Sequence, residues 1–394
     1  MDTDPVDVKP GGLNLAERML HALMLACVTH DASDLHLTPG LSPRLRVHGE
    51  LKSIPGHPVI TADDSAAMAK ILLHRQQGVS AQLDESLQLK GSVDGALTAP
   101  DGSRFRFNYF RRQNQIAIVL RRLEETFRSL SDLGLPESLH ALTDLRDGLV
   151  VISGATGAGK STTLATLLDR VNRTRSAHII TIEDPIEYIH KPVKCVVNQR
   201  QIGVDAPCFN DALVSALRQD PDVILVGEIR DLETIRTAIT AAETGHLVFT
   251  TLHAGDCVSS IERLVSVFPA DEQDGIRRQL SLVLRAIIAQ HLLPTQGKGR
   301  TDSSRVASSE ILLVNPAIAN LIATGRSTQI YSCMEAGQMY GMQTLEQDLA
   351  RLWVKGTISD AVANATARNT GTLRDRVELL RKGQAATVSS GGQR

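Results

Sequence analysis

The chain has 394 residues, of which 42% are hydrophobic and 22% charged. This length exceeds one average domain, and the composition is that of a soluble globular protein, which excludes wholesale disorder. The 42 basic and 44 acidic residues give a net charge of -2, and only 3% of residues are aromatic, which is unlike a dedicated nucleic-acid-binding protein.

The first 125 residues predict a small α+β domain. Apolar residues at helical spacing predict an amphipathic helix over Leu13 to Thr29 and a second helix over Ala66 to Leu73. Alternation over Leu35 to Val47, interrupted by a Thr-Pro-Gly turn, predicts two strands. The basic stretch from Arg104 to Leu123 alternates on both sides of Gln113-Asn114 and predicts a β-hairpin.

The second half predicts a different architecture, in which short apolar strands alternate with helices. A polar segment over residues 126–146 is expected to be a linker. The predicted strands are 149–153, 178–182, 223–226 and 247–251, and the predicted helices are 161–172, 209–218 and 232–243. This order indicates a mostly parallel sheet covered on both faces. Residues 258–382 are expected to be mainly helical, and residues 383–394 to form a disordered tail.

A phosphate-binding loop follows the first of these strands. The string from Gly154 to Ser161 matches GxxxxGK[ST] and lies between a predicted strand and a predicted helix, the context that this motif requires. Lys160 is expected to reach the β- and γ-phosphates of a nucleoside triphosphate, and Ser161 to bind Mg²⁺. The expected nucleotide-binding residues are Gly154, Ala155, Thr156, Gly157, Ala158, Gly159, Lys160, Ser161 and Thr162.

A second motif is an apolar strand from Asp222 that ends in an acid, Glu228. A carboxylate at the carboxyl end of a strand neighbouring the phosphate loop can hold the Mg²⁺ shell or activate a water molecule. Glu228 is therefore the first candidate for the general base and a candidate metal ligand. The alternative is a solvated acid at the start of the next helix.

Three further acids, Glu183, Asp184 and Glu187, follow another predicted strand. Acids at two adjacent strand ends suggest a shared metal and water site. Glu183 is the one expected to take part, because it lies closest to the strand end. Asp184 precedes a proline and serves equally well as a turn residue.

Two histidines and two arginines complete the candidate set. His246 and His253 flank the predicted strand 247–251, where a histidine could sense the γ-phosphate, or each could be structural. Their odd spacing puts them on opposite sheet faces, so they are not expected to share a metal. In the basic hairpin, Arg106 or Arg121 could supply a cation to the phosphates, and the alternative is an ordinary solvated strand face.

The order of these motifs resembles that of a known family. The strings SDLHLTPG, GATGAGKSTTLA, TIEDPIEY, DVILVGEIRD, TGHLVFTTLH and GMQTLEQDL resemble those of PilT-like retraction ATPases of type IV pili, in the type II/IV secretion ATPase superfamily. The resemblance covers about Leu13 to Lys382. It implies a PAS-like α+β domain over 1–125 and a RecA-like α/β ATPase domain over 147–382 with a mainly helical C-terminal part.

The resemblance also implies residue roles. The family's Walker A box falls on Gly154 to Ser161, its Asp box on Glu183 to Glu187, its Walker B box on Gly227 and Glu228, and its His box on His246 and His253. Arginines of the family's N-terminal domain approach the nucleotide, and the matching strings here are RFRFN, which contains Arg106, and VLRRL, which contains Arg121.

The function implied is a motor that hydrolyses ATP with Mg²⁺, works as a homo-hexamer and drives pilus retraction on an inner-membrane platform protein. No direct contact with nucleic acid is implied, and the expected location is the cytoplasm, at the inner face of the membrane. The five cysteines, none in a CxxC pair, fit a reducing compartment and disfavour zinc-containing assembly and type II relatives.

One segment departs from the family pattern. Relatives have an AIRNLIRE-type segment that is needed for retraction, and this chain has Ala317 to Thr324, with Ala319, Ala323 and Thr324 in place of charged residues. A pilus-assembly, type II or type IVB secretion ATPase therefore remains the alternative function.

Overall fold

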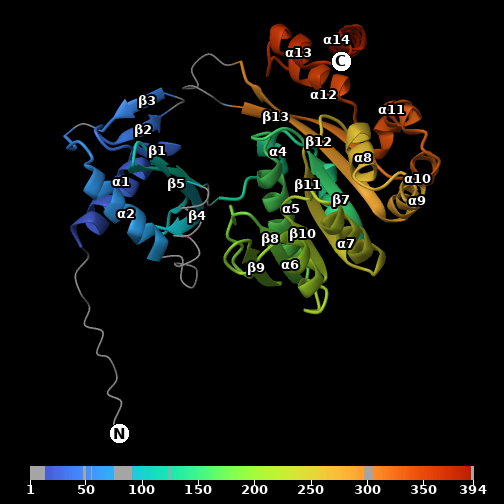
Figure 1. The fold of residues 1–394 in the computed structure, drawn as a ribbon. Helices are drawn as coiled ribbons and strands as arrows, with labels where there is room; N and C mark the ends of the chain where they lie inside the picture. The colour runs from blue at the N-terminus through green and yellow to red at the C-terminus, as the bar shows by residue number, and fades with distance from the viewer. Residues whose placement is uncertain are drawn as a thin grey trace. The chain divides into compact units, whose positions relative to one another are not determined.

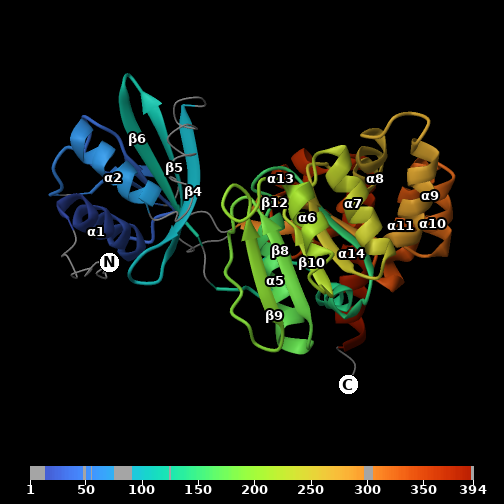
Figure 2. The same ribbon diagram turned by 60° about the horizontal axis from the view of Figure 1, so that its bottom comes forward.

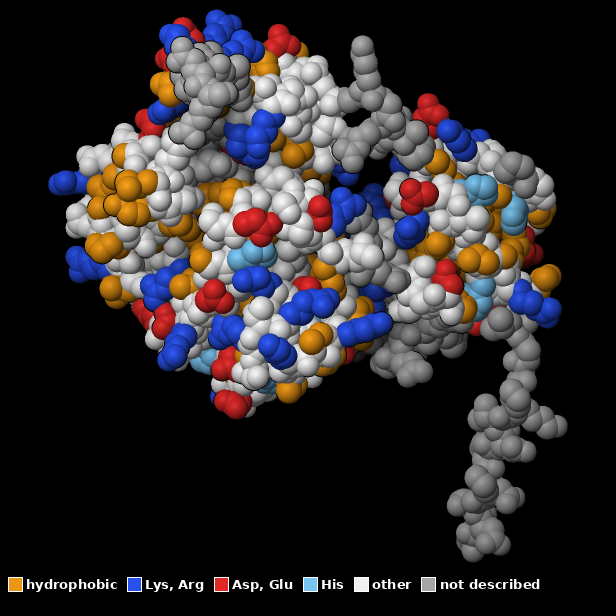
Figure 3. Space-filling model, turned by 180° about the vertical axis from the view of Figure 1, so that it is seen from behind, with side chains coloured by type: hydrophobic (Ala, Val, Ile, Leu, Met, Phe, Trp, Pro, Cys, Tyr) orange, Lys and Arg blue, Asp and Glu red, His pale blue; other side chains and the backbone are white. Residues whose placement is uncertain are grey.

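The computed structural model describes residues 14–47, 50–54, 56–74, 91–123, 126–296 and 305–391. The chain divides into two compact units, residues 1–125 and residues 126–394. No helix in the described ranges is both long and apolar enough to span a lipid bilayer. Basic and acidic side chains are interspersed on the face drawn in Figure 3, as the nearly equal numbers of the two kinds suggest.

Unit 1 is an antiparallel sheet with two helices (Figure 1), in the strand order β3-β2-β1-β6-β5-β4. Its strands are β1 (Asp34–Leu37), β2 (Arg44–Val47), β3 (Glu50–Ser53), β4 (Ser92–Thr98), β5 (Arg104–Arg112) and β6 (Gln115–Arg122), and its helices are α1 (Leu15–Thr29) and α2 (Ala62–His74). The predicted α+β class of this unit and the elements predicted in it are confirmed.

Local sequence explains these elements. The side chain of Asn14 accepts a hydrogen bond from the backbone N–H of Glu17 and caps α1. Strand β5 alternates between buried and half-buried residues from Arg104 to Phe110, so Phe105, Phe107 and Tyr109 enter one core. Gln113 and Asn114 both have positive φ, the conformation of a two-residue type I′ hairpin turn.

Unit 2 contains a seven-stranded sheet in the order β13-β12-β7-β11-β10-β8-β9. Its strands are β7 (Gly148–Ser153), β8 (His178–Glu183), β9 (Val196–Gln201), β10 (Val223–Val226), β11 (Leu247–Leu252), β12 (Leu284–Pro294) and β13 (Arg305–Leu313). Every pairing is parallel except that of β12 with β13. The predicted α/β class and the mostly parallel sheet are confirmed.

Helices cover both faces of this sheet (Figure 2). The helical segments are α4 (Leu130–Leu133), η1 (Glu137–Asp144), α5 (Lys160–Thr174), α6 (Phe209–Ala216), α7 (Leu232–Glu243), α8 (Cys257–Ser266), α9 (Gln273–Val283), α10 (Pro316–Ala323), η2 (Ser327–Gln329), α11 (Ile330–Ala336), η3 (Gly337–Tyr340), α12 (Leu345–Val354), α13 (Asp360–Thr366) and α14 (Thr370–Gly391).

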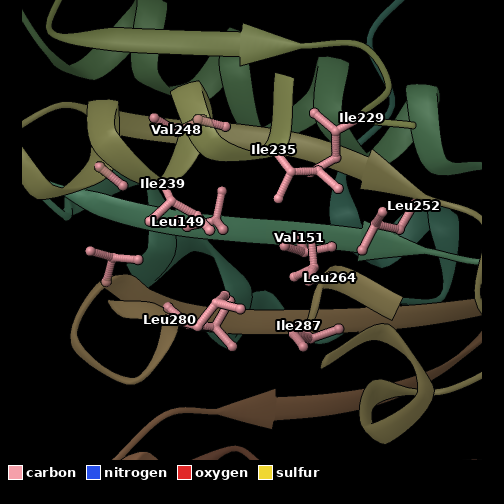
Figure 4. Close-up of a cluster of buried hydrophobic side chains, with 14 of the residues drawn as sticks. Leu149, Val151, Ile229, Ile235, Ile239, Val248, Leu252, Leu264, Leu280 and Ile287 are labelled. Atoms are coloured by element: carbon pink, nitrogen blue, oxygen red, sulfur yellow. The ribbon is translucent and has the colours of Figure 1, made fainter. Parts of the chain in front are cut away.

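The alternation of side chains along β7 separates two cores. Leu149 and Val151 join the cluster formed with α6 to α11, part of which is drawn in Figure 4. Val150 and Ile152 join the cluster on the other face, with α4, η1 and α5. Because all six residues of β7 are buried, the strand has no polar face, as expected in the interior of a parallel sheet. This burial fixes the strand that leads into the phosphate loop.

The prediction that residues 258–382 are mainly helical missed β12 and β13. Seven of the eleven residues of β12 are buried, among them the apolar run from Ala286 to Ala289, and an apolar run of this kind cannot be told from a buried helix by periodicity. The two strands pair antiparallel over nine registered positions and extend the sheet beyond β7.

Two boundary predictions were also wrong. Residues 126–146 do not form a free linker, because they include α4 and η1, whose residues Leu130, Leu139 and Leu142 are buried in the core with α5. The tail expected to be disordered over residues 383–394 is helical as far as Gly391, because α14 continues into it, and residues 392–394 lie outside the described residues.

Candidate nucleotide-binding and catalytic site

The phosphate loop joins β7 to α5, the strand-to-helix context that the motif predicts. Gly154, Gly157 and Gly159 have φ values of 148°, 79° and 89°, which L residues rarely adopt. A Cβ atom on Gly154 would lie 2.5 Å from the carbonyl oxygen of Gln290 in β12. Glycine at this position therefore allows the loop to pass close to the backbone of β12.

Lys160 begins α5 and its side chain turns back into the loop. Its Nζ donates hydrogen bonds to the carbonyl oxygens of Gly154, at 2.8 Å, and Ala155, at 3.0 Å. Burial lowers the pKa of Lys160, and the charges of Glu228 and Glu187 oppose this shift. The ammonium group is thus held by backbone carbonyls that a phosphate oxygen can replace, since a hydrogen bond between two charged groups is stronger than one from an ammonium group to a neutral carbonyl.

The first turn of α5 supplies the next two candidates. Ser161 is exposed at the start of the helix, where the helix dipole favours an anion. The hydroxyl groups of Thr162 and Tyr188 lie 3.0 Å apart and share a hydrogen bond. This contact ties the helix to the segment that follows β8.

Glu228 lies just beyond the carboxyl end of β10, as the sequence predicts. The prediction of a strand neighbouring the phosphate loop was wrong, because β11 lies between β7 and β10. Three hydrogen bonds fix the backbone here: Gly227 N to Ile182 O at 2.8 Å, Thr251 Oγ1 to Gly227 O at 2.6 Å, and Ile229 N to Thr251 O at 3.3 Å. The acid is therefore held between the ends of β8 and β11.

The carboxylate of Glu228 has two cationic or potentially cationic partners. Arg230 binds it with two nitrogens, Nε to Oε1 and one terminal nitrogen to Oε2, both at 2.6 Å. His253 Nε2 lies 3.0 Å from Oε1. Burial alone would raise the pKa of Glu228, but the hydrogen bond from Arg230 and the charges of His253, Arg230 and Lys160 lower it. Glu228 is thus an ionised carboxylate at neutral pH.

Glu183 ends β8 with a buried carboxyl group. Its Oε1 accepts hydrogen bonds from Thr181 Oγ1, at 2.6 Å, and Gln199 Nε2, at 3.2 Å. Burial raises the pKa of Glu183, and these hydrogen bonds oppose the shift. Among its acidic neighbours, Asp184 is exposed before a cis proline, and Glu187 is half-buried and interacts electrostatically with Lys160.

The structure separates the two predicted histidines. His246 lies at the opposite end of β11 from His253, where its Nδ1 is 2.9 Å from the carbonyl oxygen of Ala241. Arg106 and Arg121 belong to unit 1, where Arg121 forms an ion pair with the buried Asp34 at 2.8 Å. Arg106 lies 3.9 Å from Asp94.

Sequence reasoning missed the residues that hold Glu228. Arg230 stands two positions after Glu228, and this close spacing is the sequence signal that could have identified it as a partner of the carboxylate. Thr251 was treated only as the end of a strand, yet its hydroxyl binds the backbone beside Glu228. Gln199, which binds Glu183, was missed as well, because it comes from β9, a strand that the sequence did not predict.

The donor set fits magnesium bound together with a triphosphate. Within the described ranges, no three His, Cys, Asp or Glu side chains are grouped so that they could hold a metal ion. Mg²⁺ is usually held by one or two protein oxygens together with substrate phosphates, and it keeps several waters. The hydroxyl of Ser161 and the carboxylate of Glu228 are protein oxygens of this kind.

Comparison with known proteins assigns the chain to a family. The profile of the type II/IV secretion system proteins matches residues 11–383. The chain belongs to this family. Members similar to it include the type IV pilus retraction ATPase PilT of Pseudomonas aeruginosa, 44% identical over 86% of this chain and 94% of the relative. A twitching motility protein of Neisseria gonorrhoeae is 43% identical over 84% of this chain and 86% of the relative.

Solved structures of the type II/IV secretion system family agree with the fold. The crystal structure of a pilus retraction motor PilT with bound ADP superimposes with a TM-score of 0.81, at 39% identity, over 92% of this chain and 99% of that one. The architecture expected from the family resemblance is therefore confirmed, and the resemblance itself is borne out by both comparisons.

Proposed function

We propose that this chain is an ATP-hydrolysing motor that drives the retraction of type IV pili. The observation that carries the proposal is that the phosphate loop after β7 and the carboxylate of Glu228 after β10 lie at the same edge of the parallel sheet, where the charges of Lys160 and Glu228 influence each other. The identity of 44% with a retraction ATPase over nearly all of that relative's length supports the pilus as the object of the work.

The residues divide the chemistry of hydrolysis among them. The loop from Gly154 to Thr162 binds the phosphates, and Lys160 exchanges its two backbone carbonyls for phosphate oxygens. Glu228 orients a water molecule and accepts its proton as the new P–O bond forms. Mg²⁺ held by Ser161 and Glu228 would neutralise charge on the β- and γ-phosphates.

Secondary roles fall to other predicted residues. His253 steadies the carboxylate of Glu228 through their 3.0 Å contact. The buried Glu183 helps Glu228 to define the water site. Within a homo-hexameric ring, Arg106 and Arg121 of unit 1 could reach the phosphates, and His246 could respond to strain along β11. This ring would act on an inner-membrane platform protein from the cytoplasmic side, without direct contact with nucleic acid.

The segment that departs from the family pattern lies in and just after α10. Ala319 is half-buried, and Thr324 follows the helix with its hydroxyl bonded to the carbonyl of Asn320 at 2.7 Å. Neither position offers a charged group to a partner. Because Ala319 and Thr324 lie outside the elements that hold Lys160 and Glu228, the missing charges leave ATP hydrolysis intact. They bear only on the coupling of hydrolysis to movement of the pilus.

Two experiments test this function. Purified protein should release phosphate from Mg·ATP, and Glu228→Gln should reduce turnover by about 10³-fold, since it removes the base while keeping the size of the side chain. Glu233→Gln is the matched control, because Glu233 is an exposed acid five positions further along, in the first turn of α7. Equal activity of the wild type and Glu228→Gln would refute the enzymatic proposal.

An experiment in the native host tests whether the motor retracts or assembles pili. With Glu228→Gln at the chromosomal locus, a retraction motor predicts more surface pili and lost twitching. Cells without pili would indicate an assembly ATPase instead. An unchanged pilus count would favour a secretion ATPase.

A further inference from the structure

Arg230 is an exposed side chain fixed on the most critical carboxylate of the site. About three quarters of the side chain is open to solvent (74%), whereas that of Glu228 is mostly covered (19%). The guanidinium group nevertheless makes a two-pronged contact with both carboxylate oxygens, at 2.6 Å each. A surface arginine gains little from an ordinary ion pair, so the position of this one beside the reacting groups calls for an explanation.

The contact limits what Glu228 can do. A carboxylate offers about four lone-pair positions, and in the structure Arg230 takes two of them and His253 a third. Only one position is then left for the two tasks proposed for Glu228, holding Mg²⁺ and receiving a water proton, and an attached guanidinium makes the carboxylate a weaker base. For turnover, Arg230 therefore has to release Glu228.

A bound triphosphate provides an alternative partner for Arg230. The γ-phosphate carries more charge than a carboxylate, and the planar guanidinium binds it in the same two-pronged manner. Lys160, which marks the phosphate position, interacts electrostatically with Glu228. The site therefore already contains three parts: a loop for the phosphates, the carboxylate of Glu228 and the guanidinium group of Arg230.

The backbone around Arg230 allows such an exchange by side-chain rotation alone. Ile229 is only 2% exposed and anchors the preceding residue. Asp231 caps α7 by accepting a hydrogen bond from Thr234 N at 2.8 Å. Because both neighbours are held and the side chain of Arg230 is 74% exposed, a change of partner needs only rotation of that side chain.

We propose that Arg230 is a catalytic cation supplied by the same chain, which leaves Glu228 and binds the γ-phosphate when Mg·ATP occupies the loop. This inference rests on the proposed ATPase function. In the reaction, the water oxygen bonds to the γ-phosphorus, the bond to the β–γ bridging oxygen breaks, and the water proton passes to Glu228. Arg230 keeps its proton throughout and stabilises the charge on the transferring group.

The test compares Arg230→Gln and Arg230→Lys with Arg173→Gln in the full chain. Arg173 is a suitable control because it is also exposed (60%) and also forms a 2.6 Å ion pair, with Asp169 on α5. Turnover is measured by phosphate release, and the affinities for ADP and for a non-hydrolysable ATP analogue are measured separately by calorimetry.

Arg230→Gln should lose about 10²-fold or more in turnover, and about tenfold in affinity for the ATP analogue, with the affinity for ADP unchanged. Arg230→Lys should recover part of the turnover, and Arg173→Gln should behave as the wild type. Unchanged or increased turnover in Arg230→Gln would overturn the proposal, since Arg230 would then only restrain Glu228. Equal losses for ADP and the analogue would also overturn it, because a structural role does not distinguish a γ-phosphate.

Failure of the ATPase function and failure of the role of Arg230 give different results. If the wild type and Arg173→Gln release no phosphate, the ATPase function itself is wrong. The ratio of analogue to ADP affinity in Arg230→Gln still decides whether Arg230 recognises the γ-phosphate.

Discussion

Replacing Arg368 with alanine should destabilise unit 2, and the loss should grow as the pH rises. Arg368 donates from a terminal nitrogen to Glu310 Oε2 at 2.6 Å, and the side chain of Glu310 has no solvent exposure. The other carboxylate oxygen accepts a hydrogen bond from the backbone N–H of Cys257, at the start of α8, at 2.9 Å. Removing the guanidinium group leaves a buried carboxylate with that one backbone partner.

The size of the effect follows from the exposure of the two partners. Breaking a fully buried ion pair by removing one member costs about 3–5 kcal/mol. About a third of the Arg368 side chain is exposed (36%), so water can enter the space that the guanidinium leaves and hydrate part of the charge. The expected loss for Arg368→Ala is therefore about 2–3 kcal/mol in the free energy of unfolding at neutral pH.

The pH dependence follows from the protonation of Glu310. Burial raises the pKa of this carboxyl, and the charge of Arg368 is the largest opposing influence. In Arg368→Ala the pKa rises further, so the folded protein holds the proton at a pH where the unfolded chain has lost it. Such a group supports the fold below its unfolded pKa, and that support is lost as the pH rises through the folded pKa. The variant should thus be closer to the wild type at pH 5 than at pH 8.

Urea unfolding at these two pH values measures the effect, and Trp353 in α12, the only tryptophan of the chain, reports on this region by its fluorescence. The double variant Arg368→Ala, Glu310→Gln removes the buried charge and should recover most of the stability lost at pH 8. A loss that is the same at both pH values, or a double variant less stable than Arg368→Ala, would show that the charge of Glu310 is not the cause.

Two further substitutions test the geometry of the site. Gly154→Ala should lower the unfolding midpoint and abolish the thermal shift produced by ADP, because its Cβ would lie 2.5 Å from the carbonyl of Gln290. In the control Gly275→Ala in α9, the Cβ would meet no atom within 4 Å, so the midpoint and the ADP shift should both be kept. Matching losses in the two variants would contradict the steric argument. His253→Ala should reduce phosphate release about tenfold, because it removes the 3.0 Å contact that steadies the carboxylate of Glu228. His246→Ala, at the far end of β11, should reduce it less, and equal effects of the two would contradict the placement.

The sequence could predict the phosphate loop because every local signal there agrees. The apolar run of β7 needs burial on both faces, the glycines permit positive φ, and α5 starts at the residue that the motif requires. The hairpin of β5 and β6 was equally readable, since Gln113 and Asn114 suit the turn and the residues on either side alternate. These features depend on neighbours in the chain.

What the sequence could not predict depends on residues distant in the chain. The strand β12 resembles a buried helix until its pairing with β7 is known. The order of β7, β11 and β10 is a property of the assembled sheet, and it puts β11, with His253 just beyond its end, between the phosphate loop and Glu228. The link from Arg368 to Glu310 spans 58 positions, and no local pattern predicts it.

The polar contacts of the site fall into two groups with different consequences. The bonds of Lys160 to two loop carbonyls and of Arg230 to Glu228 involve cations, and a triphosphate can compete for both. The bonds from Thr251 to Gly227 O and from Gly227 N to Ile182 O join the framework to itself, and a phosphate has no means of replacing them. Binding of ATP should therefore rearrange cationic side chains on a fixed backbone, which is how a preorganised site stabilises a transition state without moving its framework.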